Sequence, residues 1–217
     1  MKISHHLDDA TVVAFAAGTL GEAHRVVVSA HVTMCRVCRD AVRAAEAVGG
    51  MVFQEQDGDA VSDGCRAATL ASLDGAAQTM AVKVRGPLSD VPLPLGNLLG
   101  GKSLADLKWK VRAPGVAKFD IEMSPGSRTR LQLMRLGSGR KMPDHGHGGE
   151  ELTLILKGSY SDHTGRYLPG DVADLDEETE HQPMVDSDED CICLIATEAP
   201  TRFKSIWARL AQPFVGI

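Results

Sequence analysis

The sequence carries a group of metal-binding residue types near its amino end, in the pattern His31-x-x-x-Cys35-x-x-Cys38. Residues three and four apart lie on one face of a helix, so these three side chains can converge on a common centre. One imidazole and two thiolates are zinc ligands, and a structural zinc site takes four ligands in a tetrahedron. His5 and His6 are the nearest residues that can supply the fourth ligand.

The alternative for this motif is a surface cysteine pair beside an unrelated histidine. The histidine four residues before Cys35 and the spare histidine pair upstream favour zinc. A thioredoxin-like redox role is disfavoured because no βαβ pattern surrounds the motif. The chain has five cysteines, an odd number without the density of a disulfide scaffold, which fits a reducing compartment. We therefore expect a structural Zn²⁺ ion at this site.

A second group of ligand types lies further along the chain and comprises His145, His147, Glu151 and His181. His145 and His147 are two residues apart, so on an extended segment both face the same side. A glycine pair before Glu151 permits a tight bend, after which Glu151 opens the next strand toward the same space. This spacing resembles the first cupin motif, and His181 stands where the second cupin motif places its histidine. The second motif departs from the usual pattern, because no asparagine follows His181 and Pro183 lies close by.

Three imidazoles and one carboxylate suit Zn, Fe, Mn or Ni alike, so the residue types do not name the metal. The alternative is a barrel that has lost its metal and keeps polar residues inside. All four ligands are present, so we expect a divalent metal ion, with zinc as the first choice. Cys191 and Cys193 share one face of a predicted strand and are interpreted as small core residues, with oxidation sensing as the alternative.

The elements that position these residues differ between the two halves of the chain. Up to residue 85 the apolar residues recur at helical spacing, which predicts four helices. The first ends near Gly18, the second covers 22–31, the third covers 36–48 and ends at Gly49-Gly50, and the fourth covers 63–80. A core of alanine and valine in short helices is thin, so this half needs a staple such as a metal ion.

The segment 86–100 contains three prolines and predicts a semi-extended linker. Beyond it the pattern changes to short alternating runs separated by Gly, Pro or Asp, typical of a small β-barrel or jelly roll. The predicted strands are 109–112, 118–122, 129–133, 151–154, 159–162, 171–174 and 191–196. The fold class is therefore α+β multidomain, with a small zinc-binding helical bundle followed by a jelly-roll barrel.

These motifs together resemble the ChrR-type anti-sigma factors, in which a zinc-binding helical domain precedes a cupin-like domain. The similarity runs to the C-terminal segment ending Gln212-Pro213-Phe214. It implies a helical anti-sigma domain at 1–85, a linker at 86–100 and a cupin-like sensor domain at 101–217. It also implies that His6 is the fourth zinc ligand.

The same resemblance implies a function. The helical domain would hold an extracytoplasmic-function sigma factor in a one-to-one complex, and the cupin-like domain would release it on an oxidative signal such as singlet oxygen. The protein would be a negative regulator of transcription and not an enzyme. The alternative is a metal-dependent cupin dioxygenase, which would not require the fused zinc module.

Charge and hydropathy argue against two further classes of protein, direct nucleic-acid binders and membrane-spanning proteins. Residues 1–85 carry net charge −2 and the rest −4, without the basic excess that direct nucleic-acid binding needs. No apolar run approaches the ~18 residues needed to span a bilayer, so we expect a cytoplasmic protein without membrane contact. Residues 171–190 hold ten carboxylates and no Lys or Arg. They are interpreted as a solvated face, with a docking surface for a basic partner as the alternative.

Overall fold

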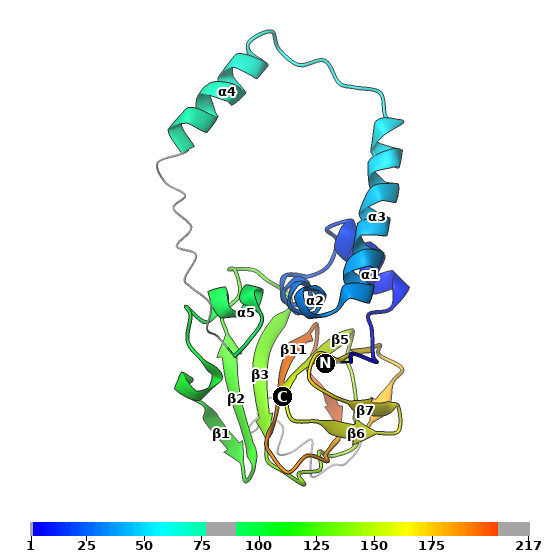
Figure 1. The fold of residues 1–217 in the computed structure, drawn as a ribbon, viewed down its shortest axis with the longest axis vertical. Coiled ribbons are helices and arrows are strands. Elements are labelled where there is room, and N and C mark those ends of the chain that lie inside the picture. The colour runs from blue at the N-terminus through cyan, green and yellow to red at the C-terminus, as the bar shows by residue number, and fades with distance from the viewer. Residues whose placement is uncertain (1, 77–89, 204–217) are drawn as a thin grey trace.

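The structure is a computed structural model that describes residues 2–76 and 90–203 (Figure 1). The predicted end of the fourth helix at Met80 and the C-terminal segment ending at Phe214 lie outside the described residues. The helices are α1 (Asp9–Ala16), α2 (Glu22–Met34), α3 (Arg36–Gln54), α4 (Cys65–Ala76) and α5 (Leu93–Leu98), with a short 3₁₀ helix η1 (Leu104–Asp106).

The ends of the first three helices follow from local chemistry. Asp8 caps α1, its carboxylate accepting a hydrogen bond from the Thr11 amide at 2.6 Å. Cys35 has an extended backbone and forms both the end of α2 and the start of α3. The prediction that α3 stops at Gly49-Gly50 was wrong. Neither glycine takes the left-handed conformation that ends a helix, and each costs a helix interior only about 1 kcal/mol.

The β domain is built from short strands, as the sequence predicted, and the strands pair antiparallel. A six-stranded sheet has the order β1-β2-β3-β11-β5-β8, and two three-stranded sheets have the orders β10-β6-β7 and β12-β4-β9. The strands are β1 (Lys110–Ala113), β2 (Val116–Ile121), β3 (Arg130–Leu136), β4 (His145–Gly146), β5 (Glu151–Lys157), β6 (Tyr160–Asp162), β7 (Gly165–Tyr167), β8 (Val172–Leu175), β9 (Glu180–His181), β10 (Met184–Val185), β11 (Cys191–Thr197) and β12 (Arg202–Phe203).

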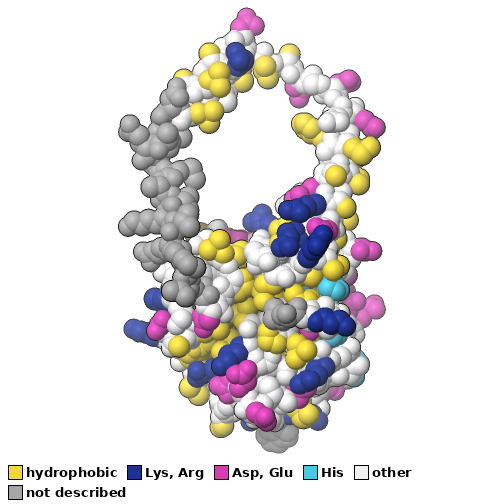
Figure 2. Space-filling model, viewed as in Figure 1, with side chains coloured by type: hydrophobic (Ala, Val, Ile, Leu, Met, Phe, Trp, Pro, Cys, Tyr) yellow, Lys and Arg dark blue, Asp and Glu magenta, His cyan; other side chains and the backbone are white. Residues whose placement is uncertain are grey.

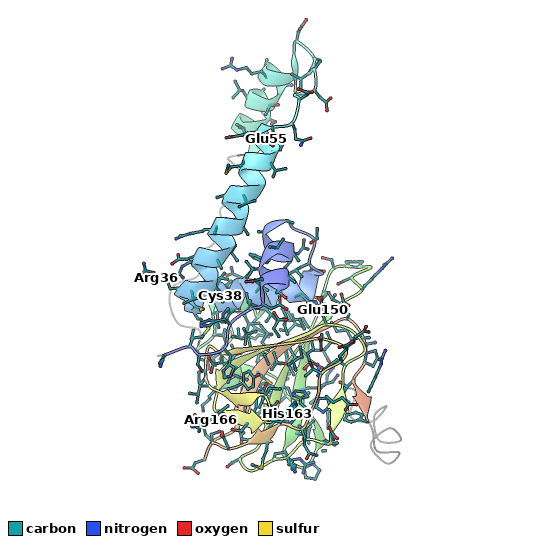
Figure 3. The ribbon with its side chains drawn as sticks, turned by 90° about the vertical axis from the view of Figure 1, so that its right-hand side faces the viewer. Arg36, Cys38, Glu55, Glu150, His163 and Arg166 are labelled. Carbon is teal, nitrogen blue, oxygen red and sulfur yellow. The ribbon has the colours of Figure 1, made fainter. Side chains whose placement is uncertain are left out.

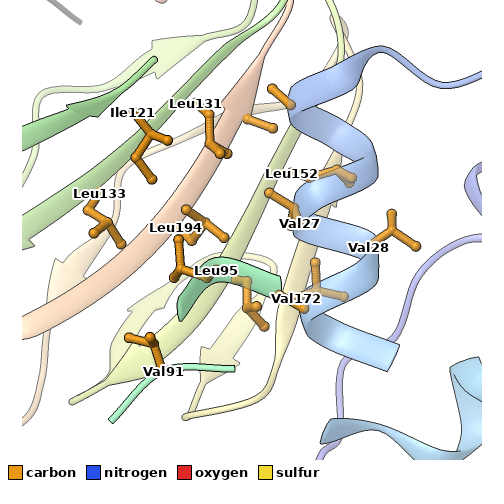
Figure 4. Packing of buried hydrophobic residues seen from close by; sticks show 14 of the residues in the cluster. Val27, Val28, Val91, Leu95, Ile121, Leu131, Leu133, Leu152, Val172 and Leu194 are labelled. Atoms are coloured by element: carbon orange, nitrogen blue, oxygen red, sulfur yellow. The ribbon is translucent and has the colours of Figure 1, made fainter. Parts of the chain in front are cut away.

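Both faces of β5 and β11 in the large sheet are buried, which explains the continuous apolar run of β11. Leu194 and Ala196 face α2, whereas Cys193 and Ile195 face the barrel interior. Figure 4 shows α2 lying along the sheet, with Val27 close to Leu152. The helical half and the β half therefore share one hydrophobic cluster, so the thin helical core is extended by the sheet beneath it.

The segment 93–98 differs from the prediction. Instead of an extended linker it forms the short helix α5, which packs against α2. Pro94 lies in the first turn, where a missing backbone N–H costs nothing, so the proline does not oppose this helix. Leu95 is fully buried in the shared cluster, whereas Leu93 is 63% exposed.

This burial predicts that Leu95→Ala lowers the free energy of unfolding by about 2–5 kcal/mol, the cost of a cavity in a packed core. Leu93→Ala, the matched control on the exposed side of the same helix, should change it by about 0.5 kcal/mol or less. Urea denaturation of both variants measures the difference. Equal, small losses would show that α5 does not contribute to the core.

Helices α3 and α4 extend away from the β domain (Figure 1). Met51, Val52 and Phe53 near the end of α3 are 67%, 55% and 78% exposed, and Leu70 and Leu73 of α4 are 50% and 61% exposed. Yellow apolar side chains accordingly line the far parts of both helices in Figure 2. None of the described helices is long and apolar enough to cross a membrane.

Candidate metal centres

The structure brings His6, His31, Cys35 and Cys38 together, with one ligand atom from each lying within 4.8 Å of the others. His6 Nδ1 is 3.3 Å from Cys35 Sγ and 3.6 Å from Cys38 Sγ. His31 comes from the last turns of α2, Cys35 from the helix junction and Cys38 from the first turn of α3. In Figure 3, Cys38 marks the end of α3 nearest the β domain. The spacing alone left His5 and His6 open, and His6 is the one that joins the cluster.

The ring of His31 is oriented by the β domain. Its Nδ1 donates a 2.9 Å hydrogen bond to the carbonyl of Gly170, which leaves Nε2 as the ligand atom. Among the described residues, no group hydrogen-bonds to this buried Nε2. Burial lowers the pKa of His31 to about 4, so the ring is neutral at pH 7, the form that binds metal.

The thiol of Cys38 also indicates a bound metal ion. Burial raises the pKa of Cys38 to about 11, and the neighbouring Cys35 adds to the shift. Without a cation the thiol stays protonated, whereas a bound metal ion deprotonates it. Two sulfurs and two imidazoles supply four protein ligands and leave no position open, as in a structural metal site.

Of the second predicted group, the three histidines come together within the β domain, whereas Glu151 lies outside that cluster. One ring nitrogen each from His145, His147 and His181 lies within 4.8 Å of the others, and His145 Nε2 is 3.1 Å from His181 Nε2. Strands β4 and β9 place His145 directly opposite His181. Glu151, the fourth predicted ligand, opens β5 beside them, with Oε2 3.2 Å from His147 Nδ1.

Hydrogen bonds around this cluster fix two of the rings. His145 Nδ1 donates to the carbonyl of Pro143 at 2.7 Å, and His181 Nδ1 donates to Asp162 at 2.8 Å, so each presents Nε2 to the centre. Burial opposes ionisation of Asp162, but His181 and Thr164 outweigh it and lower its pKa to about 2. Sequence reasoning missed Asp162, because nothing near it in the chain marks it as a partner of His181.

The protonation and hydrogen bonding of His145, Glu151 and His147 are also compatible with a bound cation. Burial lowers the pKa of His145, which keeps the ring neutral. Burial likewise opposes ionisation of Glu151, but the contact with His147 outweighs it and its pKa is lowered. No aligned hydrogen bond reaches either ring nitrogen of buried His147 from the described residues. A carboxylate beside three imidazoles, one of which has both ring nitrogens unsatisfied, fits a bound divalent metal ion.

A cavity of about 60 Å³ adjoins His145 and His181 inside the barrel. His145, Glu151 and His181 contribute to its wall beside mostly apolar side chains, among them Met134, Met142, Tyr160, Cys193 and Phe203. Cys191 and Cys193 are unpaired and pack in the interior cluster, which confirms their interpretation as small core residues.

The burial of these two thiols carries a prediction about their reactivity. Burial raises the pKa of Cys191 to about 12 and that of Cys193 well above its usual range, so neither forms the reactive thiolate near neutral pH. We expect iodoacetamide at pH 7.5 to modify the exposed Cys65 and to leave both unmodified, as read by peptide mass spectrometry. Rapid modification of Cys191 or Cys193 in the folded protein would restore the oxidation-sensing alternative.

Comparison with known proteins places the chain in a family. Residues 102–200 match the family described as the ChrR Cupin-like domain. The chain is 40% identical over its whole length to the Anti-sigma-E factor ChrR of Cereibacter sphaeroides, and covers all of that protein. It also matches a crystal structure of Rhodobacter sphaeroides SigE in complex with the anti-sigma ChrR, with 37% identity and a TM-score of 0.74. That match covers 90% of this chain and 99% of the other.

These matches confirm the predicted order of a helical region followed by a cupin jelly roll. They also agree with the expectation of a regulator, because the full-length relative is named for its action on a sigma factor and not for a reaction. The 40% identity is measured over all 217 residues of this chain and over the complete relative. The chain therefore belongs to the ChrR family of anti-sigma factors.

Proposed function

We propose that this protein sequesters an extracytoplasmic-function sigma factor in the cytoplasm, in a one-to-one complex, and releases it on an oxidative signal. The observation that carries the proposal is the match over 90% of the chain to a ChrR protein crystallised with the sigma factor SigE. The domains would be the helical anti-sigma domain at 1–85, the linker at 86–100 and the cupin-like sensor domain at 101–217.

The contact surface follows from the exposed apolar side chains of the helical half. Met51, Val52 and Phe53 of α3 and Leu70 and Leu73 of α4 are at least half exposed, on helices that reach away from the β domain. A groove of about 560 Å³ runs between α1 and α3 and ends at Phe53. Amphipathic helices that bury such faces in a partner are a common mode of recognition.

The first metal centre would hold Zn²⁺ and shape this helical domain. The thiolates of Cys35 and Cys38 with the imidazoles of His6 and His31 form the donor set that zinc prefers in structural sites. The ion would join the N-terminal segment to the junction of α2 and α3. Its binding energy would add to the folding energy of short helices that carry few buried residues.

The second metal centre would sense the signal. His145, His147, His181 and Glu151 would hold a divalent ion, Zn²⁺ as the first choice and Fe, Mn or Ni as alternatives. The adjoining cavity admits a small oxidant and contains oxidisable side chains. Oxidation at or near this shell would change the positions of its ligands and loosen the complex.

Co-purification with the sigma factor tests the proposal. The chain, co-expressed with an extracytoplasmic-function sigma factor from the same genome, should give a one-to-one complex by native mass spectrometry, with zinc in the anti-sigma subunit. Val52→Asp should weaken the complex at least about tenfold, because it places a charge in an apolar interface. Val111→Asp is the matched control, since Val111 is 74% exposed on the edge strand β1.

Two results would contradict the proposal. One is the absence of a complex with any extracytoplasmic-function sigma factor of that genome. The other is a complex that Val52→Asp and Val111→Asp affect equally, which would place the interface elsewhere. Turnover of a small diketone by the purified chain would instead favour the dioxygenase alternative.

A further inference from the structure

His5 is the histidine that the first metal centre does not use, and it lies against the β domain. His5 and His6 contact different parts of the structure, because His6 joins the metal-ligand cluster whereas His5 does not. The His5 ring packs on Tyr167, with ring centroids 4.2 Å apart. It also lies over Gly165, where a Cβ atom would be only 2.7 Å from His5 Nε2. Both contacts are on the β6–β7 hairpin.

The backbone around His5 is fixed to the same region by a buried carboxylate. Asp171, which is fully buried, accepts hydrogen bonds from the amides of Ser4 at 2.7 Å, His5 at 3.0 Å and Leu168 at 2.8 Å. The residue before it, Gly170, accepts the hydrogen bond from His31. The connection between β7 and β8 therefore holds two members of the first centre, His6 through its neighbour and His31 directly.

The β6–β7 hairpin also holds the second centre. Asp162, the last residue of β6, accepts the hydrogen bond from His181, and its other oxygen accepts bonds from the amide and hydroxyl of Thr164. The Thr164 hydroxyl is 2.9 Å from the Tyr167 hydroxyl. Tyr167 stacks on Tyr160 at 4.9 Å, and Tyr160 lines the cavity beside the histidines.

A continuous set of contacts thus runs from His181 through Asp162, Thr164 and Tyr167 to His5, whose neighbour is His6. We propose that His5, packed on the β6–β7 hairpin, is the positioning residue that couples the two metal centres. A change in the position of the His181 ring moves the β6–β7 hairpin. Through its contact with His5, the hairpin then changes how tightly the first centre retains its metal ion. This inference rests on the proposed zinc site but requires no partner and no oxidant.

A double-mutant cycle tests the coupling in the full chain. In a Cys65→Ser background, the zinc-loaded protein is exposed to EDTA and an alkylating reagent, and mass spectrometry follows the modification of Cys35 and Cys38. His181→Ala should accelerate this modification at least about fivefold, the lower end of typical coupling between sites. In a His5→Ala background, adding His181→Ala should change the rate less than about twofold.

Two further variants separate coupling from simple loosening of the N-terminal segment. Tyr167→Leu removes the hairpin's side of the contact without altering residues 2–8, and it should also suppress the response to His181→Ala. The matched control is His163→Ala, which makes the same histidine-to-alanine change as His5→Ala but on the exposed turn of the hairpin (Figure 3). It should keep the full acceleration by His181→Ala.

The outcomes distinguish this inference from the proposed function. Equal acceleration by His181→Ala with and without His5 would overturn the coupling and leave the zinc site intact. No acceleration in either background would do the same. Immediate alkylation of Cys35 and Cys38 in the parent protein would show that no zinc is bound there, and both proposals would fail.

Discussion

Replacing Cys35 and Cys38 together with serine is expected to abolish zinc retention at the first centre and to weaken sigma-factor binding more than about 100-fold. Structural zinc contributes about 10–16 kcal/mol in small zinc-folded peptides, which exceeds the stability of most domains. Both sulfurs lie where α2 meets α3, so losing the ion would release the N-terminal segment and the start of α3, the helix proposed to contact the partner. Elemental analysis and titration calorimetry with the sigma factor measure the two effects.

The matched control for this variant is Cys65→Ser, because Cys65 is the exposed thiol at the start of α4. It should retain the zinc and the full affinity. Circular dichroism of the double variant would show whether α1–α3 remain helical beside the intact β domain. Sigma-factor binding that survives complete removal of zinc would contradict the structural role of the ion.

The second large effect is expected at the other centre. Kept zinc-loaded and free of chelator, the double variant Glu151→Ala with His181→Ala should bind the sigma factor as the parent does, but should not release it when a photosensitiser generates singlet oxygen. The two substitutions remove half of the proposed ligands, and alanine at 181 also leaves Asp162 without its imidazole partner. The helical surface that would contact the partner is unchanged. Fluorescence anisotropy of a labelled sigma factor, recorded during illumination, follows the release.

Glu150→Ala with His163→Ala is the matched control for this experiment. It makes the same two substitutions at neighbouring but exposed positions (Figure 3), and release should remain as in the parent protein. Undiminished release by the Glu151, His181 variant would show that the metal shell does not sense the oxidant. The cupin-like domain would then act through another part of its surface.

Features that depend on local spacing could be predicted from the sequence. The pattern His31-x-x-x-Cys35-x-x-Cys38 brings three ligands together because helical residues three and four apart share a face. Alternating runs predicted seven strands, and each corresponds to a strand of the structure within a few residues at either end. The interpretation of residues 171–190 as a solvated face does not hold for Asp171 and Asp174. Their carboxylates accept hydrogen bonds from backbone amides of the N-terminal segment.

Local spacing gave the wrong prediction where contacts with distant parts of the chain offset an unfavourable local preference. The three prolines of segment 86–100 predicted an extended chain, yet α5 forms within it because Leu95 is buried against α2 and the sheet. The same limit applies to the helical half as a unit. Its apolar residues look too few for a core, but the cluster continues into strands more than a hundred residues away.

By itself the sequence determined which residue types meet in each centre and which elements carry them, since both depend on the periods of helix and strand. Only the tertiary structure decided the partners of those residues. The spacing left His5 and His6 open and the family resemblance implied His6; the physical reason for that choice is how Asp171 holds the N-terminal segment. The carbonyl of Gly170 reaches His31 across 139 positions of the chain. Such contacts depend on how separate elements are packed, and no period of the sequence encodes that.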